Sequence, residues 1–298
     1  MKILITGAYG QLGRALVAQS NVLGLQALAP SRRQLDITDL ENVKHFLGLH
    51  KPFVVVNAAA YTQVDNAETE KSLAVAVNKT GCANIAQTCA ANGIPLIQIS
   101  TDYVFDGRKR TPYLETDPIA PSGVYGRSKA EGEKEIRSHL EQHIILRTSW
   151  LYGVHGHNFV KSILKFAGEK KIIRVVSDQY GSPTSAFDLA QVIFIIVGFL
   201  IKNTAVAWGT YHYCGHGVIS WHEFAEAIVN FARTYFDVKT TLVEPIKTAD
   251  YPSKAARPFF SALDCSLIEK HFGIVPKPWH KSLKSTIQSL LSSREGCF

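Results

Sequence analysis

Short apolar runs alternate with longer amphipathic segments over the first 150 residues. The apolar runs predict strands at residues 2–6, 24–29, 53–57, 95–100 and 143–148, and the segments between them predict helices over 14–19, 40–49, 70–92 and 128–140. Asp39 is a natural N-cap for the second helix, and Gly93 should end the third. Strands and helices that alternate at this spacing indicate a parallel, doubly wound α/β sheet.

The pattern becomes less regular after residue 150. It predicts an apolar helix over 186–201, a strand over 211–214 and a helix over 221–235, which Ser220 and Glu223 should open as a capping box. The longest apolar stretch, 189–201, is shorter than the roughly 20 residues that span a bilayer, so a buried core helix explains it better. We expect a smaller, α-rich lobe that lends some elements back to the sheet.

A glycine-rich turn joins the first strand to the first helix. Gly7, Gly10 and Gly13 form the pattern G-x-x-G-x-x-G directly after residues 2–6. Glycines at such a turn let a pyrophosphate approach the backbone and lie at the helix N-terminus, whereas an ordinary tight turn is the alternative. We therefore predict a Rossmann-like NADP-binding domain over residues 1–150 and a substrate-binding lobe over 151–298.

Two further features concern the dinucleotide. NAD sites commonly carry an acidic residue after the second strand, whereas an arginine there accommodates a 2′-phosphate. Ser31, Arg32 and Arg33 occupy this place, so they favour NADPH over NADH unless the arginines are simply solvated. The third strand ends in the small residues Ala58–Ala60, which permit close approach of a flat ring.

Three polar residues are candidates for a proton-donating site. Thr101 follows the strand at 95–100, at the sheet edge where open α/β sheets bind ligands. Tyr125 and Lys129 are four residues apart, so on a helix their side chains lie on one face. A phenol and an ammonium would then point together toward Thr101.

The spacing of this pair is weak evidence by itself. At a usual lysine content of roughly 6%, eleven tyrosines would give about 0.6 such pairs by chance. Tyr235 and Lys239 repeat the spacing near the end of another helix, with no cofactor motif before them. Only the context of Tyr125 and Lys129 distinguishes the two pairs.

Composition limits the classes of partner. A net charge of +7 suits anionic partners, but lysines and arginines are scattered, and no nucleic-acid recognition pattern is present, so a phosphorylated small molecule is favoured over nucleic acid. The chain has neither a signal peptide nor a membrane span in its pattern, and a cytoplasmic protein is expected. An odd number of cysteines without Cys-x-x-Cys agrees with a reducing compartment: Cys82, Cys89, Cys214, Cys265 and Cys297.

His212, Cys214 and His216 alternate along the predicted strand and are candidates for a metal site. No fourth ligand follows at a recognisable spacing, so a structural role is favoured and no metal is predicted. His155 and His157 are expected to lie on a loop surface rather than to act in catalysis.

Motifs along nearly the whole chain belong to one pattern. They are Gly7-x-x-Gly10-Gln-Leu-Gly13, Leu35-Asp-Ile-Thr-Asp39, Asn57-Ala-Ala-Ala-Tyr-Thr-Gln-Val-Asp65, Ser100-Thr-Asp-Tyr-Val-Phe-Asp-Gly107, Tyr125-x-x-x-Lys129, Arg147-Thr-Ser-Trp-Leu-Tyr-Gly153, Gly181-Ser-Pro-Thr184, Arg257-Pro258 and Ser261-Ala-Leu-Asp264. Together they resemble the dTDP-4-dehydrorhamnose reductases of the extended short-chain dehydrogenase/reductase superfamily. The resemblance implies reduction of the C4 ketone of a dTDP-linked 4-keto-6-deoxysugar, dTDP-4-dehydro-L-rhamnose, with hydride from NADPH or possible use of NADH, for dTDP-rhamnose and polysaccharide biosynthesis.

The resemblance and the motifs together imply three sets of site residues. Those expected at the cofactor are Gly7, Gly10, Gln11, Leu12, Gly13, Ser31, Arg32, Asp36, Ile37, Ala58, Ala59, Ala60, Tyr61, Thr62, Tyr125 and Lys129. Those expected at the substrate are Thr62, Val64, Thr101, Asp102, Tyr103, Tyr125, Trp150 and Arg257. Catalysis is expected from Tyr125 as proton donor, Lys129 lowering its pKa, and Thr101 orienting the carbonyl.

Some alternatives stay open at this point. Some members of the family are joined through Mg²⁺ held by acidic side chains just before the Leu-Ala of the apolar helix, where this chain has Phe187-Asp188. A metal-bridged dimer is therefore not expected, and a homodimer is left open. A non-catalytic NADP-binding regulatory subunit and a reductase of another 4-keto sugar nucleotide are the alternative functions. A dehydratase is disfavoured, because Asp102 is followed by Tyr103 rather than by glutamate.

Overall fold

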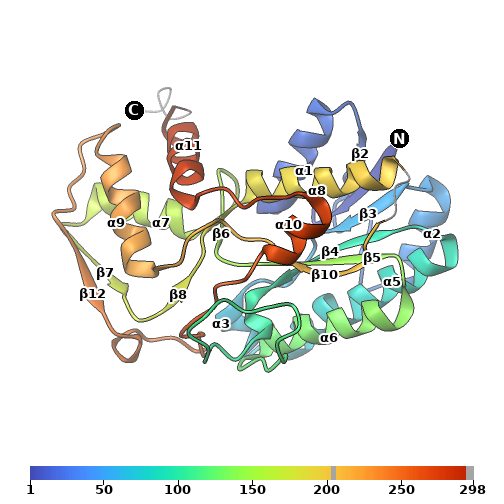
Figure 1. Ribbon diagram of the computed structural model, residues 1–298, viewed down its shortest axis with the longest axis horizontal. Coiled ribbons are helices and arrows are strands. Elements are labelled where there is room, and N and C mark those ends of the chain that lie inside the picture. The colour runs from blue at the N-terminus through green and yellow to red at the C-terminus, as the bar shows by residue number, and fades with distance from the viewer. Residues whose placement is uncertain (203–205, 293–298) are drawn as a thin grey trace.

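A parallel sheet of six strands lies at the centre of the larger part of the molecule, in a computed structural model that describes residues 1–202 and 206–292 (Figure 1). The strand order is β10-β5-β4-β3-β1-β2. These strands are Lys2–Thr6 (β1), Gln26–Leu28 (β2), Val54–Asn57 (β3), Leu96–Thr101 (β4), His143–Thr148 (β5) and Gly209–His212 (β10). The order reverses between β1 and β3, and such a switch point opens a crevice at the carboxyl ends of the strands. The predicted parallel, doubly wound α/β fold is confirmed.

Helices cover both faces of this sheet, which explains why its central strands are almost wholly apolar. One face is covered by α1 (Gln11–Val22) and α8 (Ala186–Ile201), and the other by α2 (Leu40–His50), α5 (Gly81–Asn92) and α6 (Val124–His139) (Figure 1). The apolar helix α8 packs into the core beside α1, as a buried core helix should. In the part of the chain that the structure describes, no helix combines the length and the hydropathy needed to cross a membrane.

The second part of the molecule is α-rich and has a core of its own. It contains α7 (Phe159–Glu169), β7 (Ile172–Val176), α9 (Trp221–Ala232), β12 (Leu242–Ile246) and α11 (Trp279–Ser292), with β7 and β12 paired in parallel. Strand β10 comes from the C-terminal half of the sequence, but it pairs with β5 in the large sheet. This is the strand expected at residues 211–214; it starts two residues earlier and ends at His212.

Local signals in the sequence agree with several element ends. Asp39 caps α2 by accepting from the backbone of Glu41 and Asn42, Gly93 ends α5 at φ 61°, and the Ser220 capping box opens α9. The helix expected over 70–92 is interrupted, because a π-helical turn at Ala76–Thr80 separates α4 (Lys71–Val75) from α5. The remaining short elements are α3 (Val64–Ala67), a 3₁₀ turn at Asp102–Val104, β6 (Leu151–Tyr152), β8 (Tyr180–Gly181), β9 (Thr184–Ser185), β11 (Ile219–Ser220), a 3₁₀ turn at Thr248–Asp250 and α10 (Ser266–Phe272).

Candidate active site

A cleft of about 1110 Å³ opens at the carboxyl ends of β1, β3, β4 and β5. It brings together the predicted cofactor, substrate and catalytic residues, with one exception. Ser31 does not line the cleft, and its hydroxyl and backbone N–H both donate to the Gln34 side chain. Arg33 also lies outside the cleft, whereas Arg32 lines it.

The glycine-rich turn has the geometry that its sequence predicts. A Cβ on Gly7, whose φ is +65°, would lie 2.6 Å from the backbone nitrogen of Ala59, and one on Gly13 would lie 2.1 Å from the Gly7 oxygen. Gly10 is the N-cap of α1 and provides no capping side chain. The first amides of α1 thus open onto the cleft without a side-chain cap, and an anionic group suits this helix end.

Asp36 and Arg32 form an ion pair in the part of the cleft where the cofactor is expected. Asp36 accepts from the backbone and the hydroxyl of Thr38, at 3.0 and 2.7 Å, and from Arg32 Nε at 3.3 Å. Burial raises the pKa of Asp36, but these bonds outweigh burial and hold the pKa below its ordinary value. Asp36 is therefore ionised and already paired with a cation that lines the cleft.

The loop Ala58–Thr62 is held to the helix of Tyr125 by a residue that sequence analysis missed. Asn78, in the π-helical turn, accepts from Tyr61 N at 2.9 Å and donates to both Tyr61 O and Ser128 Oγ at 3.0 Å. A Cβ on Gly132 would lie 2.0 Å from the Asn78 oxygen, so glycine permits this close approach. π-Helical turns are common at functional sites, but no pattern in the sequence announced this one.

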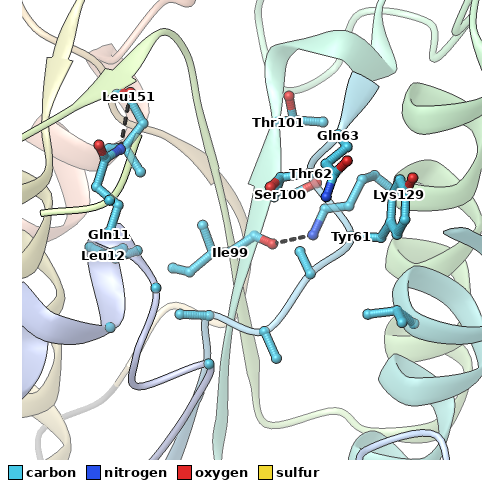
Figure 2. A pocket seen from close by; sticks show the side chains of 18 of the residues that line it. Gln11, Leu12, Tyr61, Thr62, Gln63, Ile99, Ser100, Thr101, Lys129 and Leu151 are labelled. Carbon is cyan, nitrogen blue, oxygen red and sulfur yellow. Dashed lines mark hydrogen bonds between the residues drawn. The ribbon is translucent and has the colours of Figure 1, made fainter. Parts of the chain in front are cut away.

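Thr101, Tyr125 and Lys129 all line the cleft. Helix α6 starts at Val124, four residues earlier than predicted, so Tyr125 lies in its first turn and Lys129 in its second. Lys129 Nζ donates to the Ile99 carbonyl of β4 at 2.7 Å (Figure 2). Thr101 Oγ1 donates to Asp102 Oδ1 at 2.9 Å and accepts from Tyr103 N at 3.2 Å.

The electrostatics of this pair differ from the expectation. Burial raises the pKa of the Tyr125 phenol, and its interaction with the Thr101 hydroxyl offsets this only in part. Lys129 does not lower the pKa of Tyr125, so that expectation was wrong for the chain alone. Burial lowers the pKa of Lys129 itself, against the opposing influence of Cys82 and Glu133. A low-polarity site therefore favours the neutral phenol, the form that can donate a proton.

Asp102 is a buried carboxyl group beside Thr101. Its Oδ2 atom is buried and has no hydrogen-bond partner among the described residues. Burial raises its pKa from 3.8 to about 6, against hydrogen bonds from Ser261 and Thr101. An oxygen left unpaired at the edge of a cleft fits a group that receives a bond from a ligand.

Arg257 reaches the cleft from the C-terminal part of the chain. Its Nη2 atom lies 2.7 Å from Asp65 Oδ2, and its Nη1 atom donates to the Tyr103 hydroxyl at 3.4 Å. The Tyr103 ring in turn packs edge-on against Tyr125, with 5.6 Å between ring centroids. One cation is thereby held beside Tyr103, whose ring packs against the predicted proton donor.

Two tryptophans form the wall toward the C-terminal lobe. Trp150 has φ +46°, which is rare for a bulky residue, and its ring stacks on Trp221 with centroids 3.5 Å apart. Trp221 lines the cleft and was not predicted, although the capping box correctly placed it as the first residue of α9. A strained backbone at such a wall is typical of sites where side-chain placement matters.

Several other residues that line the cleft were not predicted, although some lie within the quoted motifs and others on strands or helices. His157, expected on a loop surface, is exposed and also borders the cleft. Gln11 bonds the Leu151 carbonyl at 3.1 Å and so joins the glycine turn to the second lobe (Figure 2). The remaining unpredicted lining residues are Thr6, Ala8, Tyr9, Pro30, Leu35, Thr38, Gln63, Leu73, Val77, Ile99, Ser100, Thr148, Ser149, Leu151 and Gly156.

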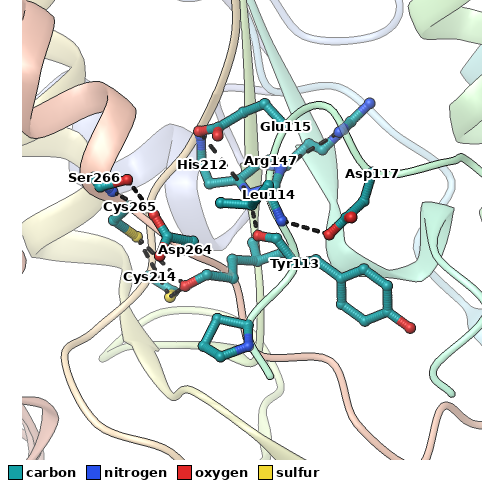
Figure 3. A network of polar contacts seen from close by, with 12 residues as sticks. Tyr113, Leu114, Glu115, Asp117, Arg147, His212, Cys214, Asp264, Cys265 and Ser266 are labelled. Atoms are coloured by element: carbon teal, nitrogen blue, oxygen red, sulfur yellow. Dashed lines mark hydrogen bonds and ion pairs between the residues drawn. The ribbon is translucent and has the colours of Figure 1, made fainter. Parts of the chain in front are cut away.

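Two of the candidate metal ligands, His212 and Cys214, have other contacts. His212 is buried, with Nδ1 3.1 Å from the Tyr113 carbonyl and Nε2 3.3 Å from Arg147 Nη1 (Figure 3). Cys214 Sγ lies 3.7 Å from Cys265 Sγ. Within residues 1–202 and 206–292, no three His, Cys, Asp or Glu side chains are grouped as metal ligands would be. Cys297 lies outside the described residues.

Asp188, at the place where the family resemblance raised the question of metal-binding acids, is bonded within the chain. Lys277 Nζ lies 2.9 Å from Asp188 Oδ1, and the Ser282 hydroxyl donates to Oδ2. An ammonium already neutralises this carboxylate. The absence of a metal-bridged dimer stays a prediction, as does a homodimer of any other kind.

Known proteins are similar to this chain over nearly its whole length. The RmlD substrate binding domain family matches residues 1–292. The dTDP-4-dehydrorhamnose reductase of Aggregatibacter actinomycetemcomitans is 44% identical over 95% of this chain and 97% of its own.

Solved structures agree with the sequence comparison. A dTDP-4-dehydrorhamnose reductase from Clostridium acetobutylicum superposes with a TM-score of 0.91 at 37% identity, over 97% of this chain and 99% of that one. The enzyme of the same name from Bacillus anthracis, in complex with NADP, gives a TM-score of 0.90 at 35% identity, with the same coverage. The resemblance drawn from the motifs is thus confirmed, and the chain belongs to the RmlD family of dTDP-4-dehydrorhamnose reductases.

Proposed function

We propose that this protein reduces the C4 ketone of dTDP-4-dehydro-L-rhamnose to dTDP-L-rhamnose, with NADPH as the hydride source, in the supply of rhamnose for surface polysaccharide. The observation that carries the proposal is the meeting of Thr101, Tyr125 and Lys129 with the glycine-rich turn in one cleft. Membership of the reductase family supports it, as does the NADP held by the Bacillus anthracis relative.

The residues of the cofactor side fit a dinucleotide. The cradle of Gly7 and Gly13 leaves no room for a Cβ, and the uncapped end of α1 suits a pyrophosphate. Arg32 would face a 2′-phosphate, and the loop Ala58–Thr62 would lie beside the nicotinamide. When bound there, the reduced nicotinamide supplies the hydride for C4.

The chain's own residues would then transfer a proton to the C4 oxygen. Tyr125 donates its phenolic proton to the C4 oxygen, and the Thr101 hydroxyl holds that oxygen in place. Lys129 has three N–H donors and uses one on Ile99, which leaves two for ribose hydroxyls. With the cofactor in place, its positive charge would favour the phenolate that forms as the proton leaves.

The substrate side is proposed from the residues that line the opposite wall. Arg257, next to Tyr103, is suited to the substrate diphosphate, because a guanidinium binds phosphate oxygens in pairs. Thr62, Val64 and Trp150 complete this wall, and Asp102 offers an oxygen for a ligand hydroxyl.

The test is the loss of NADPH absorbance when the purified protein meets dTDP-4-dehydro-L-rhamnose, with NADH in parallel. Rapid loss with NADPH would support the reaction and the substrate together. No loss from a protein that still binds NADPH would refute this substrate. The assignment would then pass to another 4-keto sugar nucleotide, or to a non-catalytic regulatory subunit.

A further inference from the structure

A buried ion pair joins the helix of Tyr125 and Lys129 to strand β5 of the sheet. Glu133 follows Lys129 by one turn of α6, so Tyr125, Lys129 and Glu133 lie on one face of the helix. Its partner is Arg147 of β5. The two side chains are 1% and 2% exposed.

The Glu133 carboxylate contacts both strands at the level of Thr101. Arg147 Nε and Nη2 donate to its two oxygens at 2.8 and 2.7 Å, in a bidentate arrangement. Ser100 Oγ donates to Oε1 at 2.6 Å. Ser100 directly precedes Thr101 and pairs in register with Arg147 across β4 and β5. One carboxylate thus fixes α6 to the strand ends that carry the site.

The other side of Arg147 is fixed as well. Its guanidinium lies 5.1 Å from the Phe105 ring and 3.3 Å from His212 Nε2, and Figure 3 shows Arg147 and His212 side by side. Burial and the charge of Arg147 lower the pKa of His212 to about 3, so this imidazole is neutral. Glu133 therefore provides the buried carboxylate that balances Arg147, and it also pairs with the partly exposed Arg137 at 3.2 Å.

Stability is a poor explanation for such a pair. Removing two charges from water costs several kcal/mol per ion, and apolar replacements of similar volume are often neutral or stabilising. The two parallel hydrogen bonds of a bidentate pair are directional, whereas an apolar contact is not. The pair therefore holds the helix in one orientation. That property matters here, since a shift of about 1 Å in a reacting group can cost ~10²-fold in rate.

We propose that Glu133 and Arg147 are positioning residues, whose ion pair sets the rotation and height of α6 so that Tyr125 and Lys129 face Thr101. The proposal rests on the proton-donor role given to Tyr125 above. It assigns no contact with substrate or cofactor to either residue.

Two variants separate positioning from stability. The double variant Glu133→Leu/Arg147→Met removes both charges together, and it should melt within a few degrees of the wild type. Its kcat should fall about 10²-fold, while KM for the sugar nucleotide changes less than about threefold. Arg147→Lys keeps the positive charge but loses the paired N–H donors of the guanidinium, and its kcat should fall about tenfold.

The matched control is Arg174→Lys. Arg174 pairs with Glu244 at 2.6 Å on the surface, with side chains 73% and 39% exposed, and this change should leave kcat unaltered. Wild-type kcat in both folded Arg147 variants would overturn the proposal. Loss of folding in both would also overturn it, by making the pair a stability element.

Failure of the proposed substrate would be recognised separately, because the wild type itself would then not turn over. The same variants would in that case be compared by NADPH affinity. Displacement of Lys129 should weaken binding about tenfold, the loss of about 1.4 kcal/mol. Unchanged affinity in folded variants would reject the positioning role.

Discussion

Two tyrosine–lysine pairs with the same spacing occur in this chain, and they have opposite surroundings. Tyr125 and Lys129 lie in the first turns of α6, at the carboxyl edge of the sheet, and Lys129 is 4% exposed. Tyr235 and Lys239 follow the end of α9 at Ala232, in an irregular segment, and Tyr235 is 39% exposed. The comparison teaches that the position of the pair in the fold, and not its spacing, creates a site.

Helical geometry explains the difference. Residues four apart share a face only while the chain remains helical. Helix α6 runs on to His139, so Tyr125 and Lys129 share a face, whereas the backbone after Ala232 leaves the helix and separates Tyr235 from Lys239. Burial then changes the chemistry of the first pair alone.

The largest expected effect is the loss of the proton donor. Tyr125→Phe should lower kcat at least ~10²-fold, because general acid catalysis contributes about that much. NADPH affinity should be retained, since the ring stays in place. Steady-state kinetics and a fluorescence titration measure the two quantities. Tyr235→Phe is the matched control, and a comparable loss there would erase the distinction between the pairs.

The second largest effect concerns Asp102, which should make the free energy of unfolding depend on pH. Its carboxyl ionises near pH 6 when folded, against an ordinary value of 3.8, because burial disfavours its charge. Between these values the folded state binds more protons, so its stability falls as pH rises from about 4 to 6. The cost above pH 6 is on the order of 3 kcal/mol.

Asp102→Asn should remove this cost. Relative to the wild type, the variant should gain on the order of 3 kcal/mol in free energy of unfolding between pH 4 and pH 7, measured by urea denaturation. Asp237→Asn, in the exposed segment of the second pair, is the control, and its curve should follow the wild type. A constant difference between Asp102→Asn and the wild type at all pH values would contradict this account.

Lys129→Met should have a smaller effect on turnover than Tyr125→Phe. The change removes a charged hydrogen bond worth about 1.5–3 kcal/mol, so kcat/KM should fall roughly 10- to 100-fold. Thermal stability should hold or rise, because a buried ammonium is replaced by an apolar chain of similar length. Lys239→Met should change neither quantity, and activity equal to the wild type in Lys129→Met would remove lysine from the mechanism.

The parts of this site that sequence could predict are those with a local signal. Gly7 and Gly13 are required by close backbone contacts within one turn, and Thr101 is placed by the end of an apolar run. Trp221 and Asn78 depend on contacts with residues far away in the sequence, and a π-helical turn leaves no periodic pattern.

The fold shows the same division. Strands β1 and β5 have the predicted bounds, because each is a buried apolar run with clear ends. Strands β7 and β12 were not predicted, since exposed and polar residues interrupt both, and each is defined by pairing with a partner about 70 residues away. Pairing over such distances is set by the packed structure and not by local preference.

The smallest expected effect concerns two neighbouring arginines near the expected cofactor site. As with the tyrosine–lysine pairs, their positions in the fold distinguish them. Arg32 lines the cleft and Arg33 does not, although they are adjacent and alike. Arg32→Ala should raise KM for NADPH about fivefold and leave KM for NADH unchanged, because only the first cofactor has a 2′-phosphate. The effect is modest, since the Arg32 side chain is 68% exposed and water screens its charge. It should shrink further at high salt, where the Debye length falls to about 3 Å at 1 M. Arg33→Ala is the control, and equal effects of Arg32→Ala on both cofactors would show that Arg32 does not recognise the phosphate.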